Sequence, residues 1–284
     1  MSNSNIKKWD LVIKPKTGWL FIHLGEILKY RDLIYLFVKR DFVTLYKQTI
    51  LGPLWYIIQP LVNSWIYTLI FSKVAKIPTD GAPPYLFYMS GTVAWGYFAL
   101  CLGGTSSTFV SNADLFGKVY FPRLIVPISK VISALLQFMI QFVIFLAFYV
   151  YFWQAGADIK PNYLILTLPL ILLQRAALGF GFGILISSLT TKYRDLTFAM
   201  SFCVQLWMYL TPVVYPLSQV PEKYRILYVM NPMSSVVESF RGMFLGVNSL
   251  EPVHIVISIS VTAIIVSAGI IMFTRIEKTF MDTV

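Results

Sequence analysis

Few side chains in this sequence could perform chemistry, and they are scattered along it. The only histidines, His23 and His254, lie far apart, so the sequence has no His/Cys cluster with metal-ligand spacing. It also lacks the G-x-x-x-x-G-K-[ST] loop that holds nucleotide phosphates. Glu222 and Glu238 are the carboxylates that could serve as acid or base in an enzyme acting on a glycan. The sequence therefore predicts that the chain itself holds no cofactor or metal and does not hydrolyse ATP.

The elements that must position these side chains are strongly apolar. Of the 284 residues, 57% are hydrophobic and only 13% are charged, whereas soluble domains carry about 25% charged residues. This composition predicts an all-α integral membrane protein. The net charge of +10 is typical of a cytoplasmic side rich in Lys and Arg that meets anionic lipid, and we expect no nucleic-acid partner.

A membrane-spanning helix needs roughly 20 apolar residues. Six stretches are predicted to span: 54–72, 85–110, 126–152, 163–189, 196–213 and 253–274. The distribution of Lys and Arg places both termini and the loops at 111–125 and 190–195 in the cytoplasm. The predicted organisation is a cytoplasmic tail (1–25), a transmembrane domain (26–274) and a second cytoplasmic tail (275–284).

The spans contain no Asp or Glu. Carriers driven by protons or sodium usually need carboxylates inside the membrane, so this absence argues against a secondary transporter. If the chain moves a substrate uphill, a partner must supply the energy. Arg175 is a charge deep within a span, where insertion costs about 2.5–3.5 kcal/mol, and we expect it to face protein or water. Gly179, Gly183 and Ser187 form a small-residue stripe that predicts close helix packing.

Residues 26–47 have apolar side chains at helical spacing and charges elsewhere on the helical wheel. The apolar positions are Ile27, Tyr30, Leu33, Ile34, Phe37 and Val38. The charged positions are Arg31, Asp32, Lys39, Arg40 and Asp41. This pattern predicts a helix in the membrane interface, and a simple cytoplasmic anchor is the alternative.

The cytoplasmic loop at 111–123 is apolar for a segment that faces water. Leu115, Phe116, Tyr120 and Phe121 are expected on a short helix that Asn112 begins. Exposed apolar side chains on such a helix predict a docking element for a cytoplasmic partner. The alternative is that they pack against the chain's own interface helix.

The outer segment at 211–246 is predicted to form two short amphipathic helices around Asn231 and the proline that follows it. Tyr215, Glu238 and Arg241 are candidates for an outer gate, since the last two are spaced as an i, i+3 ion pair. Aromatic residues at the spans could form interfacial belts, or they could line a conduit and stack on sugar rings. The candidates for lining a conduit are Trp65, Tyr67, Trp95, Tyr97, Phe98, Trp207, Tyr209 and Arg175.

Three stretches together resemble the membrane subunit of a polysaccharide-exporting ABC transporter. They are RDLIYLFVKRDFVTLYKQTILGPLWYIIQPL (32–61 at its core), NADLFGKVYFPRLIVP (112–127) and YLTPVVYPLSQVPEKYRILYVMNPMSSVVESFR (209–241). That permease family includes O-antigen, capsule and teichoic-acid exporters, and this sequence is most similar to the O-antigen branch.

The resemblance implies a homodimer of six-span subunits in the bacterial inner membrane. Two cytoplasmic P-loop ATPase subunits would carry ATP and Mg, and the substrate would be a lipid-linked glycan. Residues 26–47 would be the interface helix, 112–121 the coupling helix and 213–245 outer re-entrant helices. The coupling residues would be Asn112, Asp114, Leu115, Phe116, Lys118, Tyr120 and Phe121. Two alternatives remain: an exporter of drugs or small lipids with the same fold, and the glycan-modifying enzyme considered above.

Overall fold

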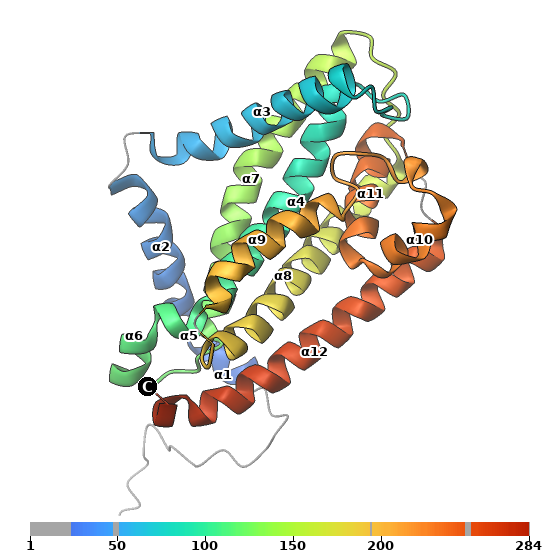
Figure 1. Ribbon diagram of the computed structural model, residues 1–284. Coiled ribbons are helices and arrows are strands. Elements are labelled where there is room, and N and C mark those ends of the chain that lie inside the picture. Colours follow the sequence, from blue (N-terminus) through green and yellow to red (C-terminus); the bar gives the residue numbers. More distant parts are fainter. Residues whose placement is uncertain (1–23, 48–50, 194, 248–250, 284) are drawn as a thin grey trace, which may run out of the picture.

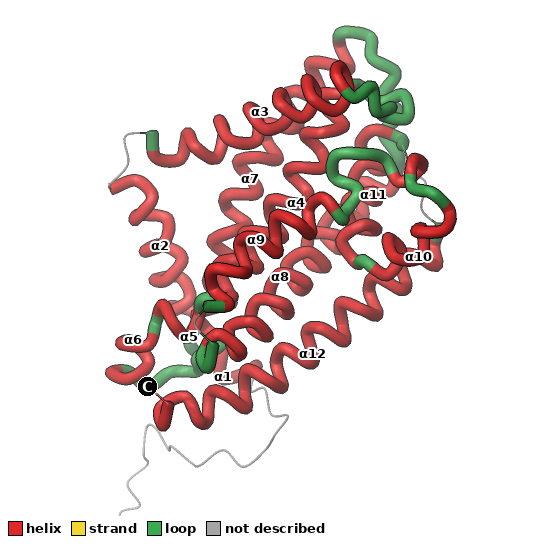
Figure 2. Tube along the Cα trace, in the orientation of Figure 1, coloured by secondary structure: helices red, strands yellow, loops and turns green. Residues whose placement is uncertain are grey.

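The computed structural model describes residues 24–47, 51–193, 195–247 and 251–283. Within these ranges every regular element is a helix, as Figure 2 shows. The first α-helices are α1 (Leu24–Lys29), α2 (Arg31–Lys47), α3 (Trp55–Tyr67), α4 (Pro84–Ser106), α5 (Thr108–Ser111) and α6 (Ala113–Lys118). The others are α7 (Ile125–Gln154), α8 (Leu168–Thr190), α9 (Leu196–Tyr209), α10 (Glu222–Met230), α11 (Pro232–Leu245) and α12 (Pro252–Thr283). Short 3-10 or π elements are η1 (Gly52–Leu54), η2 (Thr68–Val74), η3 (Tyr163–Thr167) and η4 (Leu217–Gln219).

Among the described residues, four helices are long and apolar enough to cross a membrane: Pro84–Ser106, Ile125–Gln154, Tyr163–Thr190 and Pro252–Glu277. In Figure 1, α4, α7 and α8 run through the centre and α12 along the lower right edge, from the end that carries α1, α5 and α6. In this bundle α8 packs between α4 and α12, and α4 also packs against α7. The all-α prediction is confirmed, and these four helices match four of the six predicted spans.

The other two predicted spans differ from the four long helices. The 14 residues of α9 extend about 21 Å, which is less than the hydrocarbon thickness of about 30 Å. The first predicted span is the 13-residue α3 followed directly by the 7-residue π-helix η2, so this helical run has the predicted length but changes its helix type within the span. For these two segments, crossing of the bilayer stays a prediction.

The glycines of α8 confirm the predicted close packing. A methyl group at Gly183 would overlap Thr105 Oγ1 of α4, and one at Gly179 would lie 2.5 Å from Cys101 Cβ. Gly181, on another side of α8, lies against the backbone of Val266 in α12. The missing side chains therefore let the axis of α8 approach both neighbours closely, which increases dispersion contacts within the bundle.

The predicted interface helix is present as two helices, α1 and α2, with a turn at Tyr30. Ile27 and Phe37 are buried, while Arg31 and Lys39 are exposed, so the predicted amphipathic pattern is confirmed. Lys130 Nζ of α7 lies 2.8 Å from Asp41 Oδ2, an ion pair that joins α2 to the bundle. The position of α2 in a membrane interface stays a prediction.

At the end of the bundle that the sequence predicts to face outward, called the outer end below, α10 and α11 meet at Asn231. The Asn231 side chain caps α11 by accepting from the Met233 N–H at 3.1 Å. The amphipathic pattern of α11 is present, but its polar face is not exposed, because Ser239 is the one residue of this helix that is not buried. The helix lies among α4, α8 and α12, which cover it from several sides.

The long C-terminal helix touches both ends of the bundle. Ser258 Oγ of α12 donates to the Pro232 carbonyl at 2.9 Å, near the outer end. At the other end, Arg123 Nη1 donates to the Glu277 carbonyl at 2.7 Å. The helix continues through Thr283, so residues 275–283 of the predicted C-terminal tail are helical. Residues 1–23 of the predicted N-terminal tail lie outside the described residues.

Candidate functional site

The predicted coupling loop has one buried side and one exposed side. Phe116 and Phe121 are buried, and their ring centroids lie 5.8 Å apart. Phe121 also lies 6.0 Å from the ring of Phe37 on α2. For these two phenylalanines the docking prediction is wrong, and the alternative of packing against the chain's own helix holds. Tyr120, in contrast, keeps 62% of its surface exposed, and its neighbour Val119 keeps 54%.

The other predicted coupling residues surround this exposed position. Asp114 and Lys118 are exposed and Leu115 is half-buried. Asn112 precedes α6, as predicted, but its side chain donates to the Thr108 carbonyl at 2.9 Å instead of capping α6. The backbone carbonyl of Asn112 accepts from the Phe116 N–H at 3.0 Å and begins the helix. The loop therefore presents a short charged helix followed by an exposed aromatic ring.

Several residues predicted to line a conduit lie inside the protomer instead. Tyr97 and Phe98 on α4 are 2% and 0% exposed, and Trp95 is 5% exposed. Arg175 is 0% exposed, and its guanidinium lies over the rings of Phe240 at 4.7 Å and Phe138 at 5.8 Å. These residues offer almost no surface to a conduit, so that role is corrected to packing within the bundle. Arg175 faces protein, which is one of the two environments expected for it.

The remaining aromatic candidates keep exposed surface. Trp65 on α3 is 60% exposed and Tyr209 at the end of α9 is 43% exposed. Tyr67 is half-buried and directs its hydroxyl toward Met208 Sδ at 4.0 Å. For these three residues, lining of a conduit stays a prediction.

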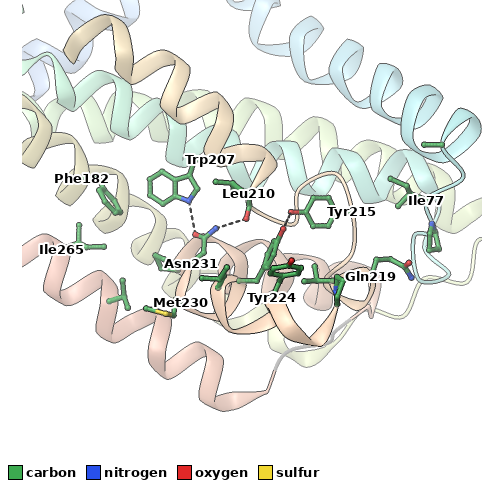
Figure 3. Close-up of a pocket in the computed structure, with 18 of the residues that line it drawn as sticks. Ile77, Phe182, Trp207, Leu210, Tyr215, Gln219, Tyr224, Met230, Asn231 and Ile265 are labelled. Atoms are coloured by element: carbon green, nitrogen blue, oxygen red, sulfur yellow. Dashed lines mark hydrogen bonds between the residues drawn. The ribbon is translucent and has the colours of Figure 1, made fainter. Parts of the chain in front are cut away.

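A large pocket of about 1090 Å³ lies at the outer end of the molecule, between α8, α9, α10, α12 and the loop at 75–78. Its walls are mainly apolar and aromatic, and Figure 3 shows Phe182, Trp207, Tyr215, Tyr224 and Asn231 around it. Flat ring faces beside a few hydroxyl and amide groups suit either sugar rings or apolar chains.

Asn231 holds the polar centre of the pocket wall. Its Oδ1 accepts from Trp207 Nε1 at 3.2 Å, and its Nδ2 donates to Thr211 Oγ1 at 2.9 Å. The Trp207 ring is also fixed by edge-to-face contacts with Phe98 at 5.1 Å and Phe182 at 4.9 Å. Asn231 therefore joins the end of α9 to the beginning of α11, and it sets the angle at which the indole faces the pocket.

Tyr215 forms a second polar group in the wall. Its hydroxyl donates to the Tyr209 carbonyl at 2.8 Å and lies 2.9 Å from the Tyr228 hydroxyl. Burial, followed by the hydrogen bond with Tyr228, raises the pKa of Tyr215 above its ordinary range. The hydroxyl therefore stays protonated and acts as a hydrogen-bonding group, without acid–base chemistry near neutral pH.

Behind this wall lies the predicted pair of Glu238 and Arg241, with Nη1 and Oε1 3.0 Å apart and both side chains at most 1% exposed. Arg241 Nη1 also donates to the Pro212 carbonyl at 2.5 Å, and Nη2 donates to the Val213 carbonyl. The guanidinium lies 3.7 Å from the ring centroid of Phe87. One buried cation thus holds the irregular backbone that follows α9 against α4 and α11.

This arrangement does not favour the glycan-enzyme alternative. Burial raises the pKa of Glu238, an effect that the adjacent Arg241 opposes, and the carboxylate has almost no surface through which to meet a substrate. The residues that line the outer pocket include no Asp or Glu. Among the described residues, no three His, Cys, Asp or Glu side chains gather as a possible metal site.

Asn231 and Tyr228, which line the pocket, and Thr211, which accepts from Asn231, were not selected as site residues by the sequence analysis. The Asn-Pro pair was a readable signal for Asn231, since an Asn before a Pro commonly caps a helix. Nothing in the local sequence marked Tyr228, because its role depends on the fold-back of α10 toward Tyr215.

Comparisons with known proteins agree with this architecture. Residues 32–245 match the protein family described as ABC-2 type transporter. An O-antigen export system permease protein RfbA from Klebsiella pneumoniae is 29% identical over 278 residues, or 96% of this chain and 99% of the relative. A protein of the same name from Myxococcus xanthus is 26% identical over 256 residues, or 89% and 96% of the two chains.

A more distant relative is the polysialic acid transport protein KpsM from Escherichia coli, which is 23% identical over 204 residues. That match covers 71% of this chain and 77% of the relative. The family match spans most of the chain and includes nearly all of α2, three of the four long apolar helices and most of the residues that line the outer pocket. The chain therefore belongs to the ABC-2 type transporter family and is a multi-pass membrane permease.

Proposed function

We propose that this chain is the permease subunit of an ATP-driven exporter that moves a lipid-linked polysaccharide, O-antigen in particular, across the bacterial inner membrane. The observation that carries the proposal is the end-to-end likeness to an O-antigen export permease, which covers 96% of this chain and 99% of the relative. The chain acts as a homodimer, each copy crosses the membrane six times, and both termini are cytoplasmic. Two copies of a separate P-loop ATPase bind ATP and Mg.

The geometry supports different functions for the two ends of the bundle. The exposed Tyr120 and the charges of α6 lie at one end, and we assign them to contact with the ATPase. The aromatic pocket lies at the other end, and we assign its Tyr and Trp faces to the passing glycan. Ring faces hold sugars by apolar contact without fixing one register, as transport of a repeating polymer requires.

The coupling assignment is tested with Tyr120→Asp and a matched control, Tyr193→Asp. Tyr193 is 52% exposed and lies after α8, outside the candidate spans. We expect Tyr120→Asp to reduce both copurification of the ATPase and glycan at the cell surface, and Tyr193→Asp to change neither. If Tyr120→Asp leaves both at the wild-type level, the coupling assignment is wrong.

The substrate is tested by deleting the gene in its own host. Loss of surface glycan together with accumulation of lipid-linked glycan inside the cell, both reversed by the wild-type chain, is the expected result. Unchanged surface glycan together with new drug sensitivity would replace the proposal with export of small molecules by the same fold.

A further inference from the structure

A second cleft, of about 440 Å³, lies between α2, α3, α4 and α7, on the side of the bundle away from the outer pocket. Its charged residues, Arg40, Asp41 and Lys130, lie at the end near α6. Farther along α7 the lining is uncharged, with Leu136 and Ile140 beside the polar Gln137. From position 130 to position 140 a helix rises about 15 Å, so the cleft changes from charged to uncharged and largely apolar over that depth.

The charges at the mouth do not cancel. The Asp41 carboxylate lies 2.8 Å from Lys130 Nζ and 3.0 Å from Arg40 Nη2, and Ser133 Oγ donates to it at 3.5 Å. Two cations and one carboxylate leave a net charge of +1. Side-chain exposure is 47% for Arg40 and 30% for Lys130, and an ammonium or guanidinium has more donors than one carboxylate uses. The mouth can therefore accept one further anionic group.

We propose that this cleft binds an anionic phospholipid. Its phosphate contacts Lys130 and Arg40, and one acyl chain lies along Leu136 and Ile140. The charge argues for this occupant, because a net charge of +1 matches one phosphodiester and is too small for a doubly or triply charged pyrophosphate. The bound lipid would bridge α2 and α7 at the point where an ion pair already joins them. The proposal needs only the membrane location of the chain, so it stands or falls separately from the exported substrate.

The test uses the full purified chain, stripped of lipid in detergent, and native mass spectrometry to count bound lipids. Phosphatidylglycerol is compared with phosphatidylcholine of identical acyl chains, because the choline cancels the phosphate charge. We expect phosphatidylglycerol to bind more tightly. Loss of one charge-assisted contact in Lys130→Gln should weaken its binding roughly tenfold. Lys39→Gln is the matched control, since Lys39 is an exposed cation on α2, next to Arg40, that does not line the cleft.

A second variant keeps the charges and fills the apolar part of the cleft. Leu136 is 41% exposed, so Leu136→Trp can be accommodated, and we expect it to lower phosphatidylglycerol binding while thermal stability without lipid is unchanged. Equal binding of both lipids, or equal binding by Lys130→Gln and Lys39→Gln, would overturn the proposal. Competition by inorganic phosphate as strong as that of phosphatidylglycerol would also overturn it, because the site would then recognise phosphate without a lipid chain.

Discussion

The buried pair of Glu238 and Arg241 allows a quantitative test of how the outer wall is held. Arg241→Met removes the ion pair and the hydrogen bonds to the carbonyls of Pro212 and Val213. It also leaves the Glu238 carboxylate buried without its counter-charge. Removing one partner of a buried pair costs about 3–5 kcal/mol. We expect Arg241→Met to have the lowest thermal stability of the set.

The partner substitutions separate the charge from the backbone contacts. Glu238→Gln leaves the guanidinium bonded to backbone carbonyls. It should therefore lower the free energy of unfolding less than Arg241→Met does, by about 1–3 kcal/mol. The double variant, Glu238→Gln with Arg241→Met, has no buried charge at this place, and we expect it to recover about 2 kcal/mol relative to Arg241→Met. Recovery should stay incomplete, because the carbonyls of Pro212 and Val213 still lack their donor.

Stability is measured in detergent by thermal unfolding, followed by the fluorescence of the seven tryptophans. The reasoning is refuted if Arg241→Met is as stable as the wild-type chain, or if the double variant is no more stable than Arg241→Met. A second measurement is glycan export by the Glu238→Gln variant. A structural Glu238 predicts near-normal export, whereas a catalytic carboxylate predicts that activity disappears.

Gly183→Ala should destabilise the bundle by about 1–3 kcal/mol through overpacking, measured in the same unfolding assay. Gly103→Ala is the control: nothing lies within 4 Å of the added carbon, so its effect should be neutral or slightly stabilising. Asn231→Ala should cost about 2 kcal/mol, since it loses a helix cap and the contacts with Trp207 and Thr211. Trp207→Phe loses one hydrogen bond and should lower the free energy of unfolding by about 1 kcal/mol. Equal losses of stability in Asn231→Ala and Trp207→Phe would contradict the central role of Asn231. Tyr215→Phe should lower glycan export more than it lowers thermal stability, as measured by surface glycan and unfolding of the same preparations; unchanged export would remove its hydroxyl from the proposed path.

The long helices were predictable from the sequence because one property, the length of the apolar run, determines whether a segment forms a spanning helix. A run such as 126–152 can satisfy its backbone in lipid only as a helix, and α7 follows over Ile125–Gln154. The shorter segments lack such a decisive property. For 196–213, composition was apolar enough, but α9 contains only 14 residues and no buried position.

The side chains of the site were harder to predict, because their roles depend on neighbours distant in sequence. Phe116 and Tyr120 are both aromatic residues of one loop, and Phe116 is buried because its ring packs against Phe109 and Phe121, whereas Tyr120 stays exposed. Arg241 was recognised as the partner of Glu238 from its spacing. Its bonds to the Pro212 and Val213 carbonyls could not be predicted, since they require the irregular backbone after α9 to fold under α11.

The length of α12 has a mechanical consequence. Its 32 residues form a rod of about 48 Å, bonded to Arg123 beside the coupling loop and to the Pro232 carbonyl beside the outer pocket. An α-helix bends far more easily than it shortens, because shortening would strain every hydrogen bond along its axis. Under the proposed function, an axial push on the coupling loop would therefore reach the beginning of α11, with α12 as a connecting rod between the two faces of the membrane.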